Sequence, residues 1–231
     1  MSTEIKLHPV QGEILRALLF KPLARFSELN LSGLSNDHFT FHIKKLLEDG
    51  LVEKVSMKYT LSTKGKEFAN RMDTDTANLE RQAKITVLVV GVQGRGNRTK
   101  YLVQQRLKQP YYGFYGYVSG KVRWGEEIVG AAMREFLEET GLSGKPSLLG
   151  IEHKLDVKEG VIQEDKFFYI CRMLSPKGEL VEDFEGGRNL WLTEDEIRGL
   201  TKVFGDMFDV LDVIKKGEFT FLEKKFEITE Y

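Results

Sequence analysis

The sequence contains little cysteine and no long apolar run, and each absence narrows the class of protein. Its single cysteine, Cys171, excludes an intramolecular disulfide, and the surrounding run FFYICRML indicates a buried strand. No stretch approaches the roughly 18 apolar residues of a membrane span, and the start MSTEIKLHPV lacks the apolar segment of a signal peptide. We therefore expect a soluble cytoplasmic protein.

A strong net charge is also absent, although the charge is unevenly distributed. The 34 lysine and arginine residues oppose 35 acidic residues, which gives a net charge of −1. Residues 1–72 hold 11 basic and 8 acidic residues, a local charge of +3, so the rest of the chain carries −4. This asymmetry permits a nucleic-acid partner for the first part and an acidic second part without requiring either.

The first 70 residues predict a small helical unit with a hairpin. Apolar residues in PVQGEILRALLF recur at helical intervals, a short helix fits Ser27 to Leu31, and a third helix runs from an N-cap at Ser35 to Gly50. Two short strands, LVEKV and KYTLS, precede a helix that starts near Thr63. This order is typical of a winged helix-turn-helix domain, which we expect over residues 1–72.

The remainder predicts a linker followed by a mixed α/β domain. Residues 73–82 lack apolar periodicity and read as a linker or linker helix. Over residues 83–231, strand patterns such as KITVLVVGVQ, YLVQQR and DKFFYICRML combine with helical ones. Thr193 and Glu196 form a predicted capping box at the start of one such helix.

The segment GKVRWGEEIVGAAMREFLEETGL concentrates carboxylates on one face of a predicted helix that ends at Gly141. Glu135, Glu138 and Glu139 fall within an arc of about 100° around this helix. We expect the opposite side to be apolar and to consist of Val129, Ala132, Met133 and Phe136. Each pair of neighbouring carboxylates costs about a few tenths of a kcal/mol, so a positive group is expected between them.

A divalent cation would meet this need. Hard cations such as Mg²⁺ bind carboxylate and carbonyl oxygens, bridge phosphate oxygens and lower the pKa of a bound water. The alternative reading of a glutamate-rich helix is a charged face in contact with solvent. The complete spacing of the segment decides between the two, because a pattern of this length is far more specific than a charged face alone.

That spacing follows the Nudix box. Gly120 is followed after five residues by Glu126 and after seven more by Arg134 and Glu135, and then come an apolar residue, Glu138, Glu139, Gly141 and Leu142. The chain therefore resembles the Nudix hydrolase superfamily. The resemblance implies an α/β/α sandwich with a mixed sheet. It also implies Mg²⁺- or Mn²⁺-dependent hydrolysis of a pyrophosphate bond in a nucleoside diphosphate linked to another group, such as ADP-ribose or a nucleotide sugar.

The resemblance also assigns roles to residues of the box. The implied metal ligands are Ser119 through its main-chain carbonyl, Glu135, Glu138 and Glu139, with Glu126 either supporting these ligands from behind or binding at a second metal site. The implied catalytic residues are Glu135, Arg134 and Glu138, with Glu135 as general base and Arg134 orienting a glutamate. Ser119 departs from the glycine that the family usually has at that position.

Further candidates for substrate binding lie outside the box. Arg106 resembles a strand arginine that faces substrate phosphate, but an exposed strand arginine is an equal alternative. Glu185 is a candidate for a further substrate-side carboxylate, against the alternative of a surface charge. The aromatic residues at 111, 112, 114, 115 and 117 could include one that stacks on a base, although aromatic stripes in strands more often belong to the core.

The predicted N-terminal domain resembles the winged-helix domains of arsenic-repressor-like regulators, through the run from His42 and Leu46 to Gly50 and Leu51. The residues that could contact DNA are Asn36, His38, Thr40, Lys44, Lys45 and Lys58. A local charge of +3 is small for a DNA-binding domain, and dimerisation would double it. Protein contact or dimerisation is the alternative role, and we expect a homodimer in either case.

Two functions therefore compete for the whole chain. In the first, the protein is an active pyrophosphate hydrolase carrying a winged helix that binds DNA or forms dimers. In the second, the Nudix domain senses a nucleotide metabolite and changes the DNA affinity of a transcription regulator. The complete box favours catalysis.

Overall fold

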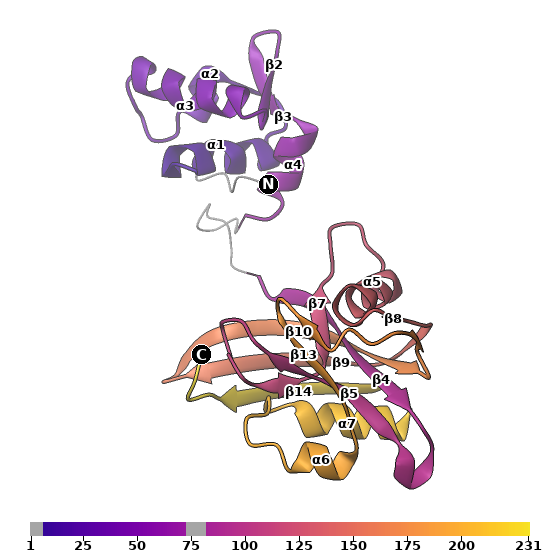
Figure 1. Ribbon diagram of the computed structural model, residues 1–231. Coiled ribbons are helices and arrows are strands. Elements are labelled where there is room, and N and C mark those ends of the chain that lie inside the picture. Colours follow the sequence, from indigo (N-terminus) through magenta and orange to yellow (C-terminus); the bar gives the residue numbers. More distant parts are fainter. Residues whose placement is uncertain (1–6, 73–81) are drawn as a thin grey trace. The chain divides into compact units, whose positions relative to one another are not determined.

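This computed structural model describes residues 7–72 and 82–231. The chain forms two compact units, Met1–Arg81 and Gln82–Tyr231 (Figure 1). The predicted linker at residues 73–82 lies, except for Gln82, outside the described residues. Among the described helices, none is long and apolar enough to cross a membrane.

The first unit combines four helices with a three-stranded antiparallel sheet. Its elements are α1 (Pro9–Phe20), β1 (Ala24–Arg25), α2 (Phe26–Leu29), α3 (Asn36–Glu48), β2 (Val52–Val55), β3 (Lys58–Leu61) and α4 (Thr63–Ala69). Ser35 is confirmed as the N-cap of α3, since its hydroxyl accepts from the amide of His38. Strand β1 was not expected; it pairs with β3, opposite β2, and completes the sheet.

The core of the first unit comes from the apolar stripes of its helices. Leu15 and Leu18 of α1 are buried with Phe39 and Ile43 of α3, and Phe26 meets Phe39 edge to face at a ring separation of 4.8 Å. Burial of large apolar side chains at helical spacing is the main source of stability for such short helices. The unit therefore has a hydrophobic core of its own.

The second unit is built on a mixed nine-stranded sheet. Its strands are β4 (Lys84–Gln93), β5 (Lys100–Arg106), β6 (Tyr115–Gly116), β7 (Val118–Lys121), β9 (Pro146–Lys158), β10 (Val161–Leu174), β12 (Asp183–Phe184), β13 (Gly187–Leu192) and β14 (Thr220–Glu227). The order is β12-β13-β5-β4-β10-β9-β14, with β6 beside β5 and β7 beside β4. Strand β10 runs parallel to β4 and β14 parallel to β9, whereas the other pairs are antiparallel.

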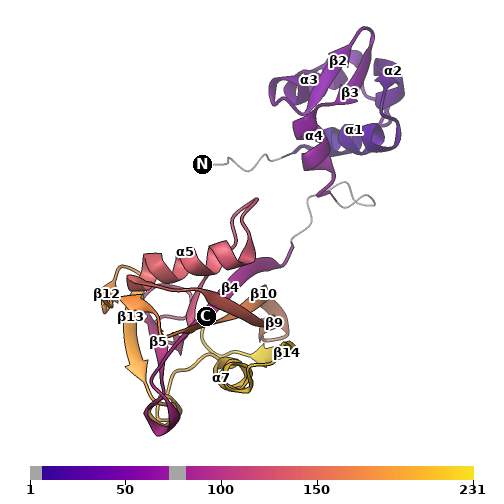
Figure 2. The ribbon, with the colours of Figure 1, turned by 90° about the vertical axis from the view of Figure 1, so that its right-hand side faces the viewer.

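Helices cover both faces of this sheet. Helix α5 (Ile128–Thr140) lies on one face, and α6 (Glu194–Arg198) and α7 (Met207–Lys216) lie on the other (Figures 1 and 2). Alternation along β4 creates two cores: Val87 and Val89 pack with α5, while Leu88 and Val90 pack with α7. The expected mixed α/β fold with a mixed sheet is confirmed.

A small two-stranded sheet and one short helix complete the second unit. Strand β8 (Leu142–Ser143) directly follows α5 and pairs with β11 (Lys177–Gly178), and a 3₁₀ helix spans Gly96–Arg98. The predicted capping box of α6 is confirmed, since Thr193 and Glu196 bond to each other's main chain. Strand β14 was not expected from the sequence, because LEKKFE has too few apolar residues to indicate a strand.

The predicted orientation of α5 is only partly right. Ala132 and Phe136 are buried as expected, but Val129 and Met133 are 40% and 46% exposed. Glu135 and Glu139 instead lie near the middle of the arc that faces the sheet, since their neighbours on that arc, Ala131, Ala132, Phe136 and Thr140, are all buried. The sequence pattern predicted that these glutamates face away from the sheet, because it does not show that a pocket, and not a packed core, lies opposite them.

Candidate functional site

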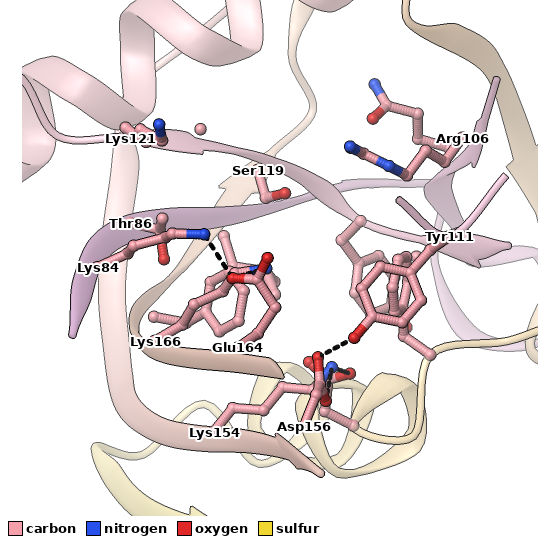
Figure 3. Close-up of a pocket in the computed structure, with 18 of the residues that line it drawn as sticks. Lys84, Thr86, Arg106, Tyr111, Ser119, Lys121, Lys154, Asp156, Glu164 and Lys166 are labelled. Carbon is pink, nitrogen blue, oxygen red and sulfur yellow. Dashed lines mark hydrogen bonds and ion pairs between the residues drawn. The ribbon is translucent and has the colours of Figure 1, made fainter. Parts of the chain in front are cut away.

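A pocket of about 450 Å³ lies in the second unit beside α5 (Figure 3). Its walls come from α5, from strands β4, β5, β6, β7, β9 and β10, from the loop between β5 and β6, and from Phe204, Asp206 and Met207. Both signs of charge face it. The acidic residues are Glu135, Glu139, Asp156, Glu164 and Asp206, and the basic ones are Lys84, Arg106, Lys108, Lys121, Lys154 and Lys166.

Arg134 binds the carboxylates of the box to one another. Its Nε and Nη2 donate to the two oxygens of Glu126, each at 2.7 Å, and its Nη1 donates to Glu135 at 2.5 Å and to Glu138 at 3.2 Å. Hydrogen bonding to this guanidinium lowers the pKa of Glu126 to about 2. Arg134 therefore contacts three carboxylates. The resemblance to the box implied that it orients one glutamate.

Gly120 allows the main chain of β7 to approach Glu135. A β-carbon at residue 120 would lie 1.9 Å from Glu135 Cδ, so any other residue here would force the Glu135 side chain to move. Ser119, immediately before it, is exposed, pairs with Leu88 of β4 and lines the pocket together with Gly120. The main chain at Ser119 and Gly120 and the carboxylate of Glu135 thus meet at one end of the pocket.

Glu139 is a half-buried carboxylate of α5 that lines the pocket. It accepts a hydrogen bond from Gln104 Nε2 at 3.0 Å and makes no ion pair within residues 7–72 and 82–231. Burial raises its pKa above the ordinary value. Glu138, in contrast, is exposed and pairs with Arg123 and Arg134.

These carboxylates do not converge on one point. In the described part of the chain, no three His, Cys, Asp or Glu side chains are grouped so that they could hold a metal ion. Glu135 and Glu138 are instead both paired with the guanidinium of Arg134. The donor set nevertheless fits Mg²⁺ or Mn²⁺, because it consists of carboxylate and carbonyl oxygens and includes a half-buried carboxylate, Glu139, that makes no ion pair among the described residues.

The two candidates outside the box have different positions. Arg106 lines the pocket, and its guanidinium donates to the main-chain oxygens of Pro110 and Gln109, while burial lowers its pKa. Glu185 is exposed in the turn between β12 and β13 and is not part of the pocket wall. The structure therefore brings Arg106, but not Glu185, into the pocket with the glutamates of α5.

Acidic residues that the sequence did not single out line the pocket instead. Glu164 of β10 is only 6% exposed and pairs with Lys84 at 2.6 Å, and Asp156 of β9 accepts from the hydroxyl of Tyr111 at 2.7 Å (Figure 3). The predicted strand began one residue after Glu164, whereas β10 begins at Val161. Charged residues at inward positions of an alternating strand were the missed signal.

The aromatic candidates differ in their exposure and in whether they line the pocket. Tyr111 and Tyr117 are buried and line the pocket, whereas Tyr112 is 56% exposed and is not part of its wall. The Tyr117 hydroxyl donates to the main-chain oxygen of Met207 at 3.2 Å. The two buried rings therefore combine a packing role with a position at the pocket.

In the first unit, the residues expected at DNA lie on α3 and β3. Asn36, His38, Lys44 and Lys45 of α3 are exposed, and Thr40 is half-buried. Lys58, at the start of β3, is also half-buried. Lys45 pairs with Asp49 at 3.1 Å, which compensates part of the positive charge.

Comparison with known proteins identifies the family of the second unit. The model of the NUDIX domain family matches residues 82–212. The mutator MutT protein from Bacillus halodurans is 23% identical, with a TM-score of 0.53 over 62% of this chain and 90% of that one. The NUDIX domain of NrtR from Shewanella oneidensis, solved with ADP ribose, is 14% identical, with a TM-score of 0.53 over 67% of this chain and 98% of that one. These structures share the fold, and the family match covers more than half of the sequence, so the chain belongs to the NUDIX domain family.

Proposed function

We propose that the second unit hydrolyses a pyrophosphate bond in a nucleoside diphosphate linked to another group, such as ADP-ribose or a nucleotide sugar, with Mg²⁺ or Mn²⁺. The observation that carries this proposal is the position of Glu135 and Glu139 in the pocket, where an apolar helix face would otherwise meet the sheet. Lys108 and Lys121 line the same pocket and make no ion pair within the described residues. A pocket that offers carboxylates to bind a metal, next to lysines that make no ion pair, suits a substrate rich in phosphate.

The box residues have defined roles in this proposal. The metal ligands are Ser119 through its main-chain carbonyl, Glu126, Glu135, Glu138 and Glu139, and the catalytic residues are Glu135, Arg134 and Glu138. When bound, the metal supplies a water of lowered pKa and neutralises charge on the phosphate oxygens. Glu135 would take a proton from the attacking water at Oε2, which takes no hydrogen bond in the described part of the chain, while Arg134 holds Oε1.

Two residues outside the box are proposed to bind the substrate. Arg106 offers Nη1, which makes no hydrogen bond within the described residues, to a phosphate oxygen. Glu185 belongs to a turn that reaches the pocket wall, because a β-carbon on the neighbouring Gly186 would lie 3.1 Å from Lys108 Nζ. From this turn Glu185 can reach the part of the substrate that lies outside the pocket.

A substrate panel tests the proposal. With Mg²⁺, the purified protein is expected to hydrolyse at least one of ADP-ribose, the dinucleotides, the nucleotide sugars and the nucleoside triphosphates. Glu138→Gln is expected to abolish that activity, and Glu179→Gln, which changes an exposed glutamate outside the pocket wall, is expected to retain it. Inactivity across the panel, or full activity of Glu138→Gln, would reject the proposal.

A ligand-responsive transcription regulator is the second candidate. We infer a winged helix-turn-helix domain at residues 1–72, a linker at 73–82 and the Nudix domain at 83–231, acting as a homodimer on double-stranded DNA. The proposed DNA-contacting residues are Asn36, His38, Thr40, Lys44, Lys45 and Lys58. This candidate is supported by the exposure of both α3 lysines and by the likeness to the NrtR domain that binds ADP ribose.

DNA binding measured by fluorescence anisotropy separates the two candidates. A regulator is expected to bind double-stranded DNA from upstream of its own gene, to lose affinity as salt rises, and to respond to ADP-ribose. Lys44→Ala combined with Lys45→Ala should weaken binding, whereas Lys66→Ala, at an exposed position of α4, should not. Absence of binding at low salt would leave protein contact or dimerisation as the role of this unit.

A further inference from the structure

Three lysines lie side by side on three neighbouring strands at the pocket. Lys84 of β4 is in register with Lys166 of β10, and Lys166 is in register with Lys154 of β9. All three line the pocket (Figure 3). Like charges at paired positions on one face of a sheet are destabilising, so this row requires negative charge from elsewhere.

Lys154 is fully compensated by the protein itself. Its Nζ lies 2.7 Å from Asp206 and 3.6 Å from Asp156, and its side chain is only 5% exposed. The rings of Phe204 and Phe226 also lie 5.0 Å and 5.3 Å from this ammonium. A lysine held in this way has a structural role at the floor of the pocket.

Lys84 and Lys166 are compensated only in part. Both ammonium groups contact the same oxygen of Glu164, at 2.6 Å and 3.4 Å. The other oxygen of Glu164 accepts from the hydroxyl of Tyr231 at 2.9 Å, so the carboxylate is fixed in place. One carboxylate therefore serves two ammonium groups, and Asp156, which also pairs with Lys154, is a further negative charge that acts on Lys166.

A fourth lysine of the pocket has no carboxylate partner among the described residues. Lys121 of β7 pairs with Thr86 of β4, two residues along the strand from Lys84, and also lines the pocket. Its ammonium makes no ion pair within residues 7–72 and 82–231. Lys84 is 40% exposed and Lys166 is 21% exposed, so both can exchange their contact with Glu164 for a contact with a ligand. In Figure 3, Lys84, Lys166 and Glu164 lie on the side of the pocket away from Arg106 and Tyr111.

We propose that Lys84, Lys121 and Lys166 form a second anion subsite, which binds a phosphate group of the substrate other than the pyrophosphate held at α5. The proposal rests on the proposed hydrolysis and specifies its substrate class. The preferred substrates are nucleoside diphosphates whose attached group itself carries a phosphate. Glu164 positions two of the lysines and competes with the incoming phosphate, because it occupies their donors in the free protein.

The subsite can be tested without activity. Binding of inorganic pyrophosphate to the full chain is measured by calorimetry in the presence of a chelator, so that no metal contributes. Lys84→Gln and Lys166→Gln are expected to weaken binding about tenfold each, since each removes a charge-assisted hydrogen bond. Lys177→Gln, at an exposed position outside the pocket wall, should bind as the unaltered protein does.

Glu164→Gln separates a binding role from a structural one. Removing this competing charge is expected to tighten pyrophosphate binding, whereas simple damage to the pocket would weaken it. Thermal unfolding of each variant shows whether the fold is retained. Unchanged affinity in both lysine variants, no binding by the unaltered protein, or weaker binding by a folded Glu164→Gln would overturn the subsite.

Substrate preference connects the subsite to the reaction. The protein is expected to hydrolyse ADP-ribose phosphorylated on its terminal ribose with a higher kcat/KM than ADP-ribose, and Lys166→Gln should remove most of this preference. Equal kcat/KM for the two compounds would contradict the subsite while leaving the hydrolase proposal intact. Hydrolysis of neither compound, together with lysine-dependent pyrophosphate binding, would count against the hydrolase proposal and support the anion site.

Discussion

The carboxylate of Glu135 lies against the main chain of Gly120, so that a β-carbon on residue 120 would come within 1.9 Å of Glu135 Cδ. This contact places a glutamate of α5 beside the main chain of strand β7, where both line the pocket. It also explains a glycine inside a strand, where glycine is usually unfavourable.

Gly120→Ala is therefore expected to displace Glu135 and to destabilise the protein by about 1–3 kcal/mol, the usual cost of overpacking. Gly130→Ala is the matched control, because a β-carbon there meets nothing within 4 Å and lies in α5. It should stabilise the helix by up to about 1 kcal/mol. Chemical denaturation of both variants measures the difference, and equal stability of the two would contradict the close contact.

The orientation of α5 can be tested by truncating adjacent residues. Phe136 is fully buried, whereas Leu137 is 51% exposed. Phe136→Ala is expected to cost about 3–5 kcal/mol of unfolding free energy, and Leu137→Ala less than about 1 kcal/mol. Similar losses for the two variants would mean that the helix is rotated from the position described.

The two hydrogen bonds that Arg134 donates to Glu126 predict an unusually low pKa for this carboxyl group. The pKa of Glu126 is lowered to about 2, first by its hydrogen bonds to Arg134, so Glu126 should stay ionised through most of the acid range. Its contribution to stability is present above the ordinary value of 4.5 and is lost as the pH falls toward 2. Carboxyl NMR titration measures this directly. In Arg134→Ala the Glu126 pKa should return toward 4.5. A low pKa that persists in this variant would show that the hydrogen bonds from Arg134 do not lower it.

His153 predicts a change of stability at higher pH. Its ring lies 2.7 Å from Glu223 of β14 and 3.1 Å from Asp165 of β10, and these carboxylates raise its pKa above 6.5. A raised pKa contributes stability below 6.5 that is lost as the pH rises through the folded value. The melting temperature should therefore fall more between pH 6 and 9 for the unaltered protein than for His153→Gln. Parallel pH profiles would show that the charge of His153 does not matter.

The sequence predicted correctly the helix ends that are determined by residues close to them in the chain. Gly141 adopts a left-handed conformation with φ of 71° and ends α5 where expected, and Ser35 and Thr193 cap their helices. The composition of the box was equally local, because its glutamates lie within one helix and the loop before it. These features depend on neighbours in sequence, which is why the sequence was sufficient for them.

The rest depends on strands that are distant in sequence. Lys84, Lys154 and Lys166 form a row only because β4, β10 and β9 pair in one particular register. Glu164 enters the pocket because β10 extends beyond the apolar run that marked it as a strand. The orientation of α5 was misjudged for the same reason, since no local pattern shows that a pocket lies opposite Glu135 and Glu139. Register and pocket position are non-local properties.

The most direct test of the account is the initial rate of ADP-ribose and nucleotide-sugar hydrolysis by the unaltered protein and by Glu139→Gln, each measured with Mg²⁺ and with a chelator. Glu139 is chosen because its half-buried carboxylate lines the pocket and makes no ion pair among the described residues. The account predicts hydrolysis that requires Mg²⁺ in the unaltered protein and a loss of at least about a hundredfold in Glu139→Gln. Hydrolysis that continues in the chelator, or an unaffected Glu139→Gln, would contradict it.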